Sequence, residues 1–148
     1  MKRLHVNLLV KDLEQSIRFY SHLFAAQPTV QRVDYAKWLL EDPRVNFSII
    51  GPSDTPGLNH LGIQTESDAE LAEVHTRMQS TQGPVSEVAA TTCCYAQGKK
   101  GWATDPQGIA WEGFFTEKDG LTHFGSMAPV EMTPAVKEQS GQQKGCCG

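Results

Sequence analysis

The sequence predicts an α+β fold in which two β-α-β-β-β modules form a half-closed β-barrel with a metal-binding cleft. Three observations predict it. Short apolar-rich strands at residues 4–10 and 59–65 each carry a histidine at the second position. A helical pattern follows each strand, and each half ends in strands joined by a tight turn. The chain is therefore expected to be a diverged internal duplication.

The first half is expected to continue from its opening strand into a helix. Asp12 is the predicted N-cap of this helix, with Gln15 three residues later. Apolar side chains then recur at helical spacing, at Leu13, Ile17, Tyr20 and Phe24. Residues 38–43, which end in Asp-Pro, are expected to lead from one strand through a tight turn into a second strand at residues 45–50.

The second half repeats this order. Ser67 and Glu70 form a capping-box pattern, and the helix that follows carries its apolar stripe at Leu71, Val74 and Met78. Residues 102–108 lead through an Asp-Pro-Gln-Gly turn, where Pro presets φ and Gly tolerates a positive φ, into a strand at residues 109–115. The linker between the halves, residues 51–57, is rich in Gly and Pro.

These patterns predict one paired domain at residues 1–120, with modules at about 3–51 and 58–117. Residues 121–148 are rich in Pro, Gln, Gly and Lys and are expected to be a flexible C-terminal tail that ends in Cys146-Cys147. The half-barrel can close within one chain or by exchange between two chains. A homodimer is the commoner oligomer by default.

Composition narrows the function classes. The net charge of −4 gives no reason to expect nucleic acid as a partner, and no basic helix or long apolar run indicates a membrane. The strand pattern begins directly after Met1-Lys2-Arg3, so no signal peptide is expected and the cytoplasm is the predicted location.

Three side chains form a candidate metal site. His5 and His60 hold the same place in the two repeats, and Glu112 lies among apolar residues, where burial of a carboxylate calls for a compensating cation. Aligning Phe47 with Trp111 puts Ser48 opposite Glu112. The predicted set is therefore two histidines and one carboxylate with open coordination positions, which is typical of non-haem Fe(II) oxygenases.

Other interpretations of these residues stay open. A histidine in a strand is often a structural residue rather than a ligand, and Glu112 can also be a surface residue. The metal also stays open, because affinity alone favours later divalent ions over Fe(II). The remaining histidines, His22, His75 and His123, are interpreted as non-ligands.

All four cysteines occur as adjacent pairs, Cys93-Cys94 and Cys146-Cys147. Neighbouring thiols make strained disulfides but can together bind one soft, thiophilic centre, although two small buried neighbours are the alternative. Because successive strand residues face opposite sides, joint binding by Cys93 and Cys94 requires a turn, and a loop is expected there. Lys99 and Lys100 are either solvated or favour the thiolates. Tyr95 and Trp102 are expected either to line the cleft or simply to pack.

The double module with His5, His60 and Glu112 resembles the vicinal oxygen chelate superfamily, which includes glyoxalases, bleomycin resistance proteins and extradiol dioxygenases. The segment at residues 91–96, with residues 102–112 after it, resembles the organoarsenical carbon–arsenic lyase branch, also called cadmium-induced protein. This resemblance implies an Fe(II) dioxygenase that uses O2 to convert trivalent organoarsenicals, such as methylarsenite, to arsenite. It also implies that the adjacent cysteines bind the arsenic.

Two further functions remain as alternatives. The chain can be a thiol-based binding or sequestration protein for cadmium or arsenite, which needs Cys93 and Cys94 but not a metal triad. It can also be a glyoxalase-like isomerase or a thiol transferase, although Ser48 weakens a four-ligand isomerase site. Cys146 and Cys147 are interpreted as possible substrate capture residues or, alternatively, as an inactive end of the chain.

Overall fold

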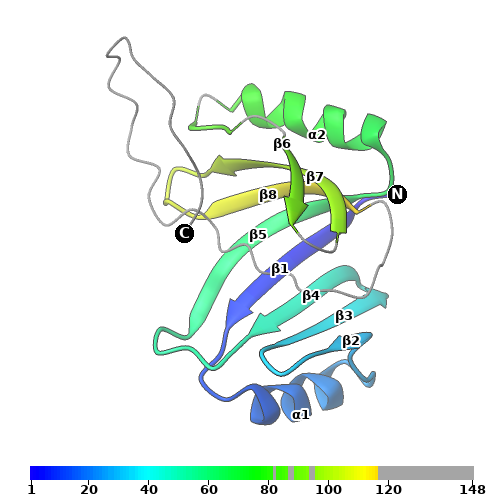
Figure 1. Ribbon diagram of the computed structural model, residues 1–148, viewed down its shortest axis with the longest axis vertical. Helices are drawn as coiled ribbons and strands as arrows, with labels where there is room; N and C mark the ends of the chain where they lie inside the picture. The colour runs from blue at the N-terminus through cyan, green and yellow to red at the C-terminus, as the bar shows by residue number, and fades with distance from the viewer. Residues whose placement is uncertain (82, 87–88, 94–95, 117–148) are drawn as a thin grey trace.

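The computed structural model describes residues 1–116 except residues 82, 87–88 and 94–95 (Figure 1). The first module consists of β1 (Arg3–Leu9), α1 (Leu13–Leu23), β2 (Val30–Gln31), β3 (Tyr35–Glu41) and β4 (Arg44–Ile50). The second module consists of β5 (Gly57–Thr65), α2 (Asp68–Gln79), β6 (Ala89–Cys93), β7 (Ala96–Thr104) and β8 (Ala110–Thr116). The predicted order, β-α-β-β-β in each half, is confirmed. The predicted tail at residues 121–148 lies outside the described residues.

All described strands belong to one mixed sheet in the order β2-β3-β4-β1-β5-β8-β7-β6. The two modules meet at the antiparallel pair of β1 and β5, and each of these strands runs parallel to the last strand of its own module. The helices α1 and α2 lie toward opposite ends of this sheet (Figure 1). The edge strands β2 and β6 are separated by the full width of the sheet, so the barrel is not closed, in agreement with the predicted half-closed form.

The strand register relates the modules by a local two-fold axis. Across the β1–β5 pair, His5 lies opposite Gly62 and Asn7 lies opposite His60, so the two histidines exchange places about the axis. In the parallel pairs, Asn7 is aligned with Ser48 and Gly62 with Glu112. The alignment of Ser48 with Glu112 that the sequence predicted is therefore the alignment in the sheet.

Both helices begin where the sequence predicts. The Asp12 carboxylate accepts a hydrogen bond from the Gln15 backbone N–H at 2.8 Å, and the Ser67 hydroxyl accepts one from the Glu70 N–H at 3.2 Å. The Glu70 carboxylate reaches back to the backbone N–H of Glu66 at 3.0 Å, one residue before the N-cap. These bonds satisfy donors that have no partner inside the helix. Neither described helix has the length and apolar character that a membrane crossing requires.

The two faces of the sheet differ in chemistry. One face carries the helices and the apolar clusters, which include Trp38, Phe47 and Ile49 in the first module. The opposite face, here called the site face, carries buried polar side chains at His5, Asn7, Asn46, Ser48, His60 and Glu112. Because strand side chains alternate between faces, this pattern separates a structural face from a chemical one. The Asp-Pro-Gln-Gly turn has Gly108 at φ +85°, which explains the glycine there.

Candidate metal centre

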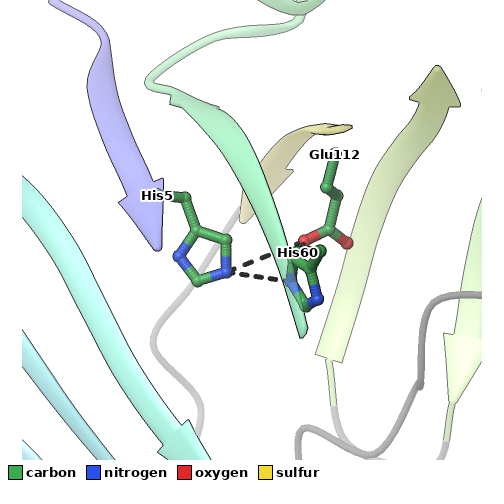
Figure 2. Close-up of side chains that lie close together, drawn as sticks. All are labelled: His5, His60 and Glu112. Atoms are coloured by element: carbon green, nitrogen blue, oxygen red, sulfur yellow. Dashed lines mark hydrogen bonds and ion pairs between the residues drawn. The ribbon is translucent and has the colours of Figure 1, made fainter. Parts of the chain in front are cut away.

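Three neighbouring strands bring the predicted metal ligands together on the site face. His5 comes from β1, His60 from β5 and Glu112 from β8, and Figure 2 shows their side chains converging. The two Nε2 atoms are 3.2 Å apart. The Glu112 Oε2 atom lies 3.5 Å from His60 Nε2 and 4.0 Å from His5 Nε2. One donor atom from each residue therefore lies within 4.8 Å of the others.

These separations suit one divalent transition-metal ion. Nitrogen and oxygen ligands lie about 2.0–2.2 Å from such an ion, so two ligands at right angles are about 3 Å apart and two at the tetrahedral angle about 3.4 Å. The separations between His5 and His60 and between His60 and Glu112 fall in or next to this range. The separation between His5 and Glu112 exceeds it by about half an ångström, which a small side-chain rotation closes. The donor set of two imidazoles and one carboxylate suits a divalent metal with open positions.

Burial and one backbone contact keep His5 neutral. Burial lowers the pKa of His5 from 6.5 to about 4, with Glu112 opposing and His60 reinforcing this shift. The His5 Nδ1 atom lies 3.0 Å from the Asn46 carbonyl oxygen, which can only accept a hydrogen bond. The Nδ1 atom must therefore carry the proton, and the Nε2 lone pair is directed at His60 and Glu112. A carbonyl that fixes the tautomer in this way is common behind metal-binding histidines.

The carboxylate of Glu112 is ionised and poorly solvated. Burial alone raises its pKa, but the facing His60, Lys100 and His5 outweigh burial, so the pKa of Glu112 lies below its ordinary value of 4.5. Within the described part of the chain, the buried Nδ1 atom of His60 has no hydrogen-bond partner. The centre thus holds one negative charge and two imidazoles whose Nε2 atoms face each other, an arrangement that a bound cation stabilises.

The fourth position about the local axis holds a neutral group. Ser48 is 1% exposed, and its hydroxyl accepts a hydrogen bond from the Asn7 amide at 2.7 Å. The Asn7 side-chain oxygen in turn accepts from the Asn59 amide at 2.8 Å. Ser48 is thus held in an amide network and supplies no carboxylate, as the sequence predicted.

Aromatic and cationic side chains border the triad. The Trp102 ring packs edge-on against His60, and Phe114 packs edge-on against His5, each at 5.1 Å between ring centroids. Trp102 therefore packs against a side chain of the triad, and its role in lining a cleft stays a prediction. Lys100 Nζ lies 3.4 Å from Glu112 Oε1, whereas Lys99 Nζ pairs with Asp68 at 3.0 Å. Sequence reasoning missed the contact of Lys100 with Glu112. Strand alternation could have indicated it, because Lys100 lies two residues before Trp102.

The predicted thiol site is described only in its backbone. Cys93 is the last residue of β6 and pairs with Ala96 of β7, so the strand reaches one residue further than the loop expected at Cys93-Cys94. The ladder to β7 holds the backbone extended up to that point. Cys94, Tyr95, Cys146 and Cys147 lie outside the described residues.

The two other described histidines each contact a backbone carbonyl. His22 Nδ1 lies 2.9 Å from the Arg18 carbonyl oxygen, and His75 Nε2 lies 3.0 Å from the Ser86 carbonyl oxygen. Neither belongs to the described cluster of metal-ligating side chains. His123 lies outside the described residues.

Comparisons with known proteins agree with this geometry. The family model for the Glyoxalase/Bleomycin resistance protein/Dioxygenase superfamily matches residues 2–112. The chain is 39% identical to the "Trivalent organoarsenical cleaving enzyme" of Bacillus sp. (strain MD1), with 99% of this chain and 91% of that protein covered. It is 32% identical to the protein of the same name from Thermomonospora curvata, covering 99% and 100%. It is 35% identical to "Cadmium-induced protein CadI" of Mycobacterium bovis, covering 85% and 83%.

Solved structures show the same fold at low sequence identity. The 2,3-dioxygenase LapB from Pseudomonas sp. KL28 superposes with a TM-score of 0.57 at 19% identity, covering 77% of this chain and 40% of that one. The Mn(II)-bound glyoxalase from Novosphingobium aromaticivorans gives a TM-score of 0.55 at 16% identity, covering 78% and 40%. This chain therefore spans about two fifths of each of these structures, and the likeness concerns the fold. The match over residues 2–112 and the full-length relatives show that the chain belongs to the Glyoxalase/Bleomycin resistance protein/Dioxygenase superfamily.

Proposed function

We propose that this protein is an Fe(II)-dependent dioxygenase that cleaves the carbon–arsenic bond of trivalent organoarsenicals and yields arsenite, in arsenic detoxification. One observation carries the proposal. The buried cluster of His5, His60 and Glu112 lies in a chain that is 39% identical to a trivalent organoarsenical cleaving enzyme over nearly its whole length. A donor set with open positions is suited to catalysis rather than to a structural metal.

His5, His60 and Glu112 would hold the iron. Fe(II) bound by two histidines and one carboxylate supplies the activation of O2 that oxidative cleavage needs. His5 enters the set as a neutral donor because burial and the Asn46 carbonyl fix its protonation. Trp102, which packs edge-on against His60, would help to keep bulk water from the site.

Cys93 and Cys94 would bind the arsenic. Trivalent arsenic is soft and exchanges oxygen ligands for thiolates, so methylarsenite, which has two exchangeable oxygens, can take two thiols and keep its methyl group. The backbone order is compatible with this role, because β6, which ends at Cys93, pairs with β7, and β7 pairs with β8, the strand that carries Glu112.

The reaction balances with O2 as the only oxidant. One methylarsenite and one O2 contain the same atoms as one arsenite and one formaldehyde, so no further reductant is required. The methyl carbon is oxidised, both oxygen atoms are reduced, and arsenic leaves in its trivalent state. From an aryl group the expected organic product is the corresponding phenol, and this reaction takes up two electrons and two protons besides O2, which two equivalents of a thiol would supply on oxidation to the disulfide.

The test is cleavage of methylarsenite by protein purified without oxygen and loaded with Fe(II). Arsenite should form with one O2 consumed per substrate, and no product should form anaerobically. Cys93→Ser and Cys94→Ser should each abolish cleavage and leave metal binding intact, whereas His60→Ala or Glu112→Ala should abolish both. Normal cleavage by the cysteine variants would show that the assigned substrate is wrong.

Sequestration of cadmium or arsenite on the thiols is the second candidate, and the relatives at 35% identity named cadmium-induced protein favour testing it. A sequestration protein would bind arsenite or cadmium in proportion to its cysteines and would not consume O2. Its binding of arsenite or cadmium would also be unaffected by loss of Glu112, because Glu112 belongs to the metal cluster and not to the thiol site. Stoichiometric binding without turnover, unchanged in Glu112→Ala, would favour this function over cleavage.

Cys146 and Cys147 would capture substrate for delivery to the cleft. Replacing both with Ser should slow turnover at low methylarsenite concentration and leave the maximal rate unchanged, because capture matters only when substrate is scarce. Identical kinetics at every concentration would remove this role.

A further inference from the structure

The carboxylate of Glu112 uses its two oxygens for different neighbours. Oε2 faces the imidazoles, at 3.5 Å from His60 Nε2 and 4.0 Å from His5 Nε2. The other oxygen, Oε1, has the Lys100 ammonium 3.4 Å away. A carboxylate can bind a metal through one oxygen or through both. The contact with Lys100 therefore affects whether one or both Glu112 oxygens are available to an ion bound beside the histidines.

Lys100 is held in this place by the sheet. Trp102 of β7 lies directly across from Glu112 of β8, and Lys100 lies across from Phe114. Lys100 and Glu112 are thus diagonal neighbours on the site face, within reach of a long side chain. The Lys100 Nζ atom also lies 5.8 Å from the centroid of the Trp102 ring, which attracts a cation and restricts where the ammonium can go.

The neighbouring lysine provides an internal comparison. The Lys99–Asp68 pair is open to solvent, with side chains 46% and 54% exposed, and such a pair contributes little. The Lys100–Glu112 pair is largely desolvated, with side chains 19% and 11% exposed. In that environment, removal of one charged side chain leaves the other charge unpaired and with little water to stabilise it, so the remaining side chain is expected to change its contacts.

We propose that Lys100 is a positioning residue that occupies Glu112 Oε1, so that Glu112 offers a single oxygen to the metal and the coordination position which the second oxygen would take stays open. The inference rests on the proposed metal site but not on the proposed substrate. It predicts that a neutral residue at position 100 lets Glu112 bind through both oxygens. The ion is then held as tightly or more tightly, and one position for reaction is lost.

The experiment loads the full-length protein with Co(II) in place of iron, without oxygen, and records the visible absorption spectrum, which reports the number and geometry of ligands. Affinity is followed by quenching of tryptophan fluorescence, since Trp102 packs against His60. Lys100→Met should change the spectrum and bind Co(II) no more weakly than the unchanged protein. Lys100→Arg, which keeps a cation near Oε1, should restore the original spectrum. Lys99→Met is the matched control and should leave both readouts unchanged.

Two results would overturn the inference. One is a Lys100→Met spectrum that superimposes on that of the unchanged protein. The other is a loss of Co(II) affinity of more than about 10-fold, the size expected when a group that supports a ligand is removed. Lys100→Gln serves the same test if the Met variant is not recovered folded. Co(II) binding is independent of turnover, so a protein that passes this test but fails to cleave methylarsenite refutes the proposed function alone.

Discussion

In the first module, α1 packs on the sheet through Tyr20 and Phe24 against Trp38 and Phe47, in a cluster of aromatic rings. In the second module, α2 packs through smaller side chains, and a cavity of about 530 Å³, open to one side, lies between the C-terminal half of α2 and the sheet. That cavity lies on the helix-covered face, behind the strands that supply Glu112 and Lys100. The same order of elements thus gives a densely packed module and a more loosely packed one.

The modules also differ on the site face. Ser48 and Glu112 occupy equivalent positions, and so do their cross-strand neighbours Lys37 and Trp102. A symmetric site would have two carboxylates, whereas here one half keeps the donor and the other has a hydroxyl held by Asn7. The comparison teaches that a single side chain at equivalent positions distinguishes the donor set of one module from that of the other.

The largest effect is expected from changing the equivalent positions Glu112 and Ser48. Glu112→Gln keeps the size of the side chain but removes its charge, so we expect divalent-metal affinity to fall by more than about 100-fold, beyond the loss typical of a supporting residue. Ser48→Ala should change the affinity by less than about 3-fold, because Ser48 supplies no ligand. Isothermal titration with Co(II) measures both. Equal losses in the two variants would contradict the assignment of Glu112 as a ligand.

The next effect concerns packing, and two side chains of similar volume provide a matched pair. Ile49 is fully buried in the first module, and Met78 lines the cavity in the second. We expect Ile49→Ala to lower the free energy of unfolding by about 4 kcal/mol and Met78→Ala by about 2 kcal/mol, because the existing cavity lets the second site lose fewer contacts. Urea denaturation measures both values. If Met78→Ala lowers the free energy of unfolding as much as Ile49→Ala does, the inferred difference in packing between the modules is wrong.

A third effect is the response of the metal-free protein to acid. The pKa of His5 is about 4 in the folded protein and 6.5 when unfolded, so between these values the unfolded chain binds the extra proton. Stability should therefore be complete above pH 6.5 and fall toward pH 4, by roughly 3 kcal/mol from this group. The lowered pKa of Glu112 adds a loss only below its ordinary value of 4.5.

The control for this acid response is His5→Gln, which is polar but does not titrate. Its unfolding free energy, measured by chemical denaturation in metal-free buffer, should depend less on pH between 6.5 and 4. A variant with the same slope as the unchanged protein would show that another group causes the acid response.

The smallest effect should be the same in both modules. Asp12→Ala and Ser67→Ala each remove a side chain that accepts a hydrogen bond at a helix start. Each should lower the free energy of unfolding by about 1 kcal/mol. Thermal unfolding of the two variants checks this. A clear difference in stability loss between the two variants would show that the modules differ at their helix N-termini as well as in the hydrophobic core and on the site face.

Much of the fold could be predicted from local chemistry. Asp12 and Ser67 mark helix starts because their side chains satisfy free backbone N–H groups, and this requires only neighbours in sequence. The site could also be predicted in part, since the repeat relates His5 to His60 and Ser48 to Glu112. The extension of β6 through Cys93 was missed, because its backbone is held by Ala96 across a hairpin and not by a local preference.

The sequence by itself determined the two modules, their helices and turns, and the three candidate donor residues, because periodicity, capping and repetition depend only on residue order. Tertiary structure decided that eight strands form one sheet, that His5 is neutral with Nε2 directed at its neighbours, and that Lys100 lies against Glu112 Oε1. These features depend on strand order and register. They bring together residues distant in sequence and remove the water that would otherwise weaken their interaction.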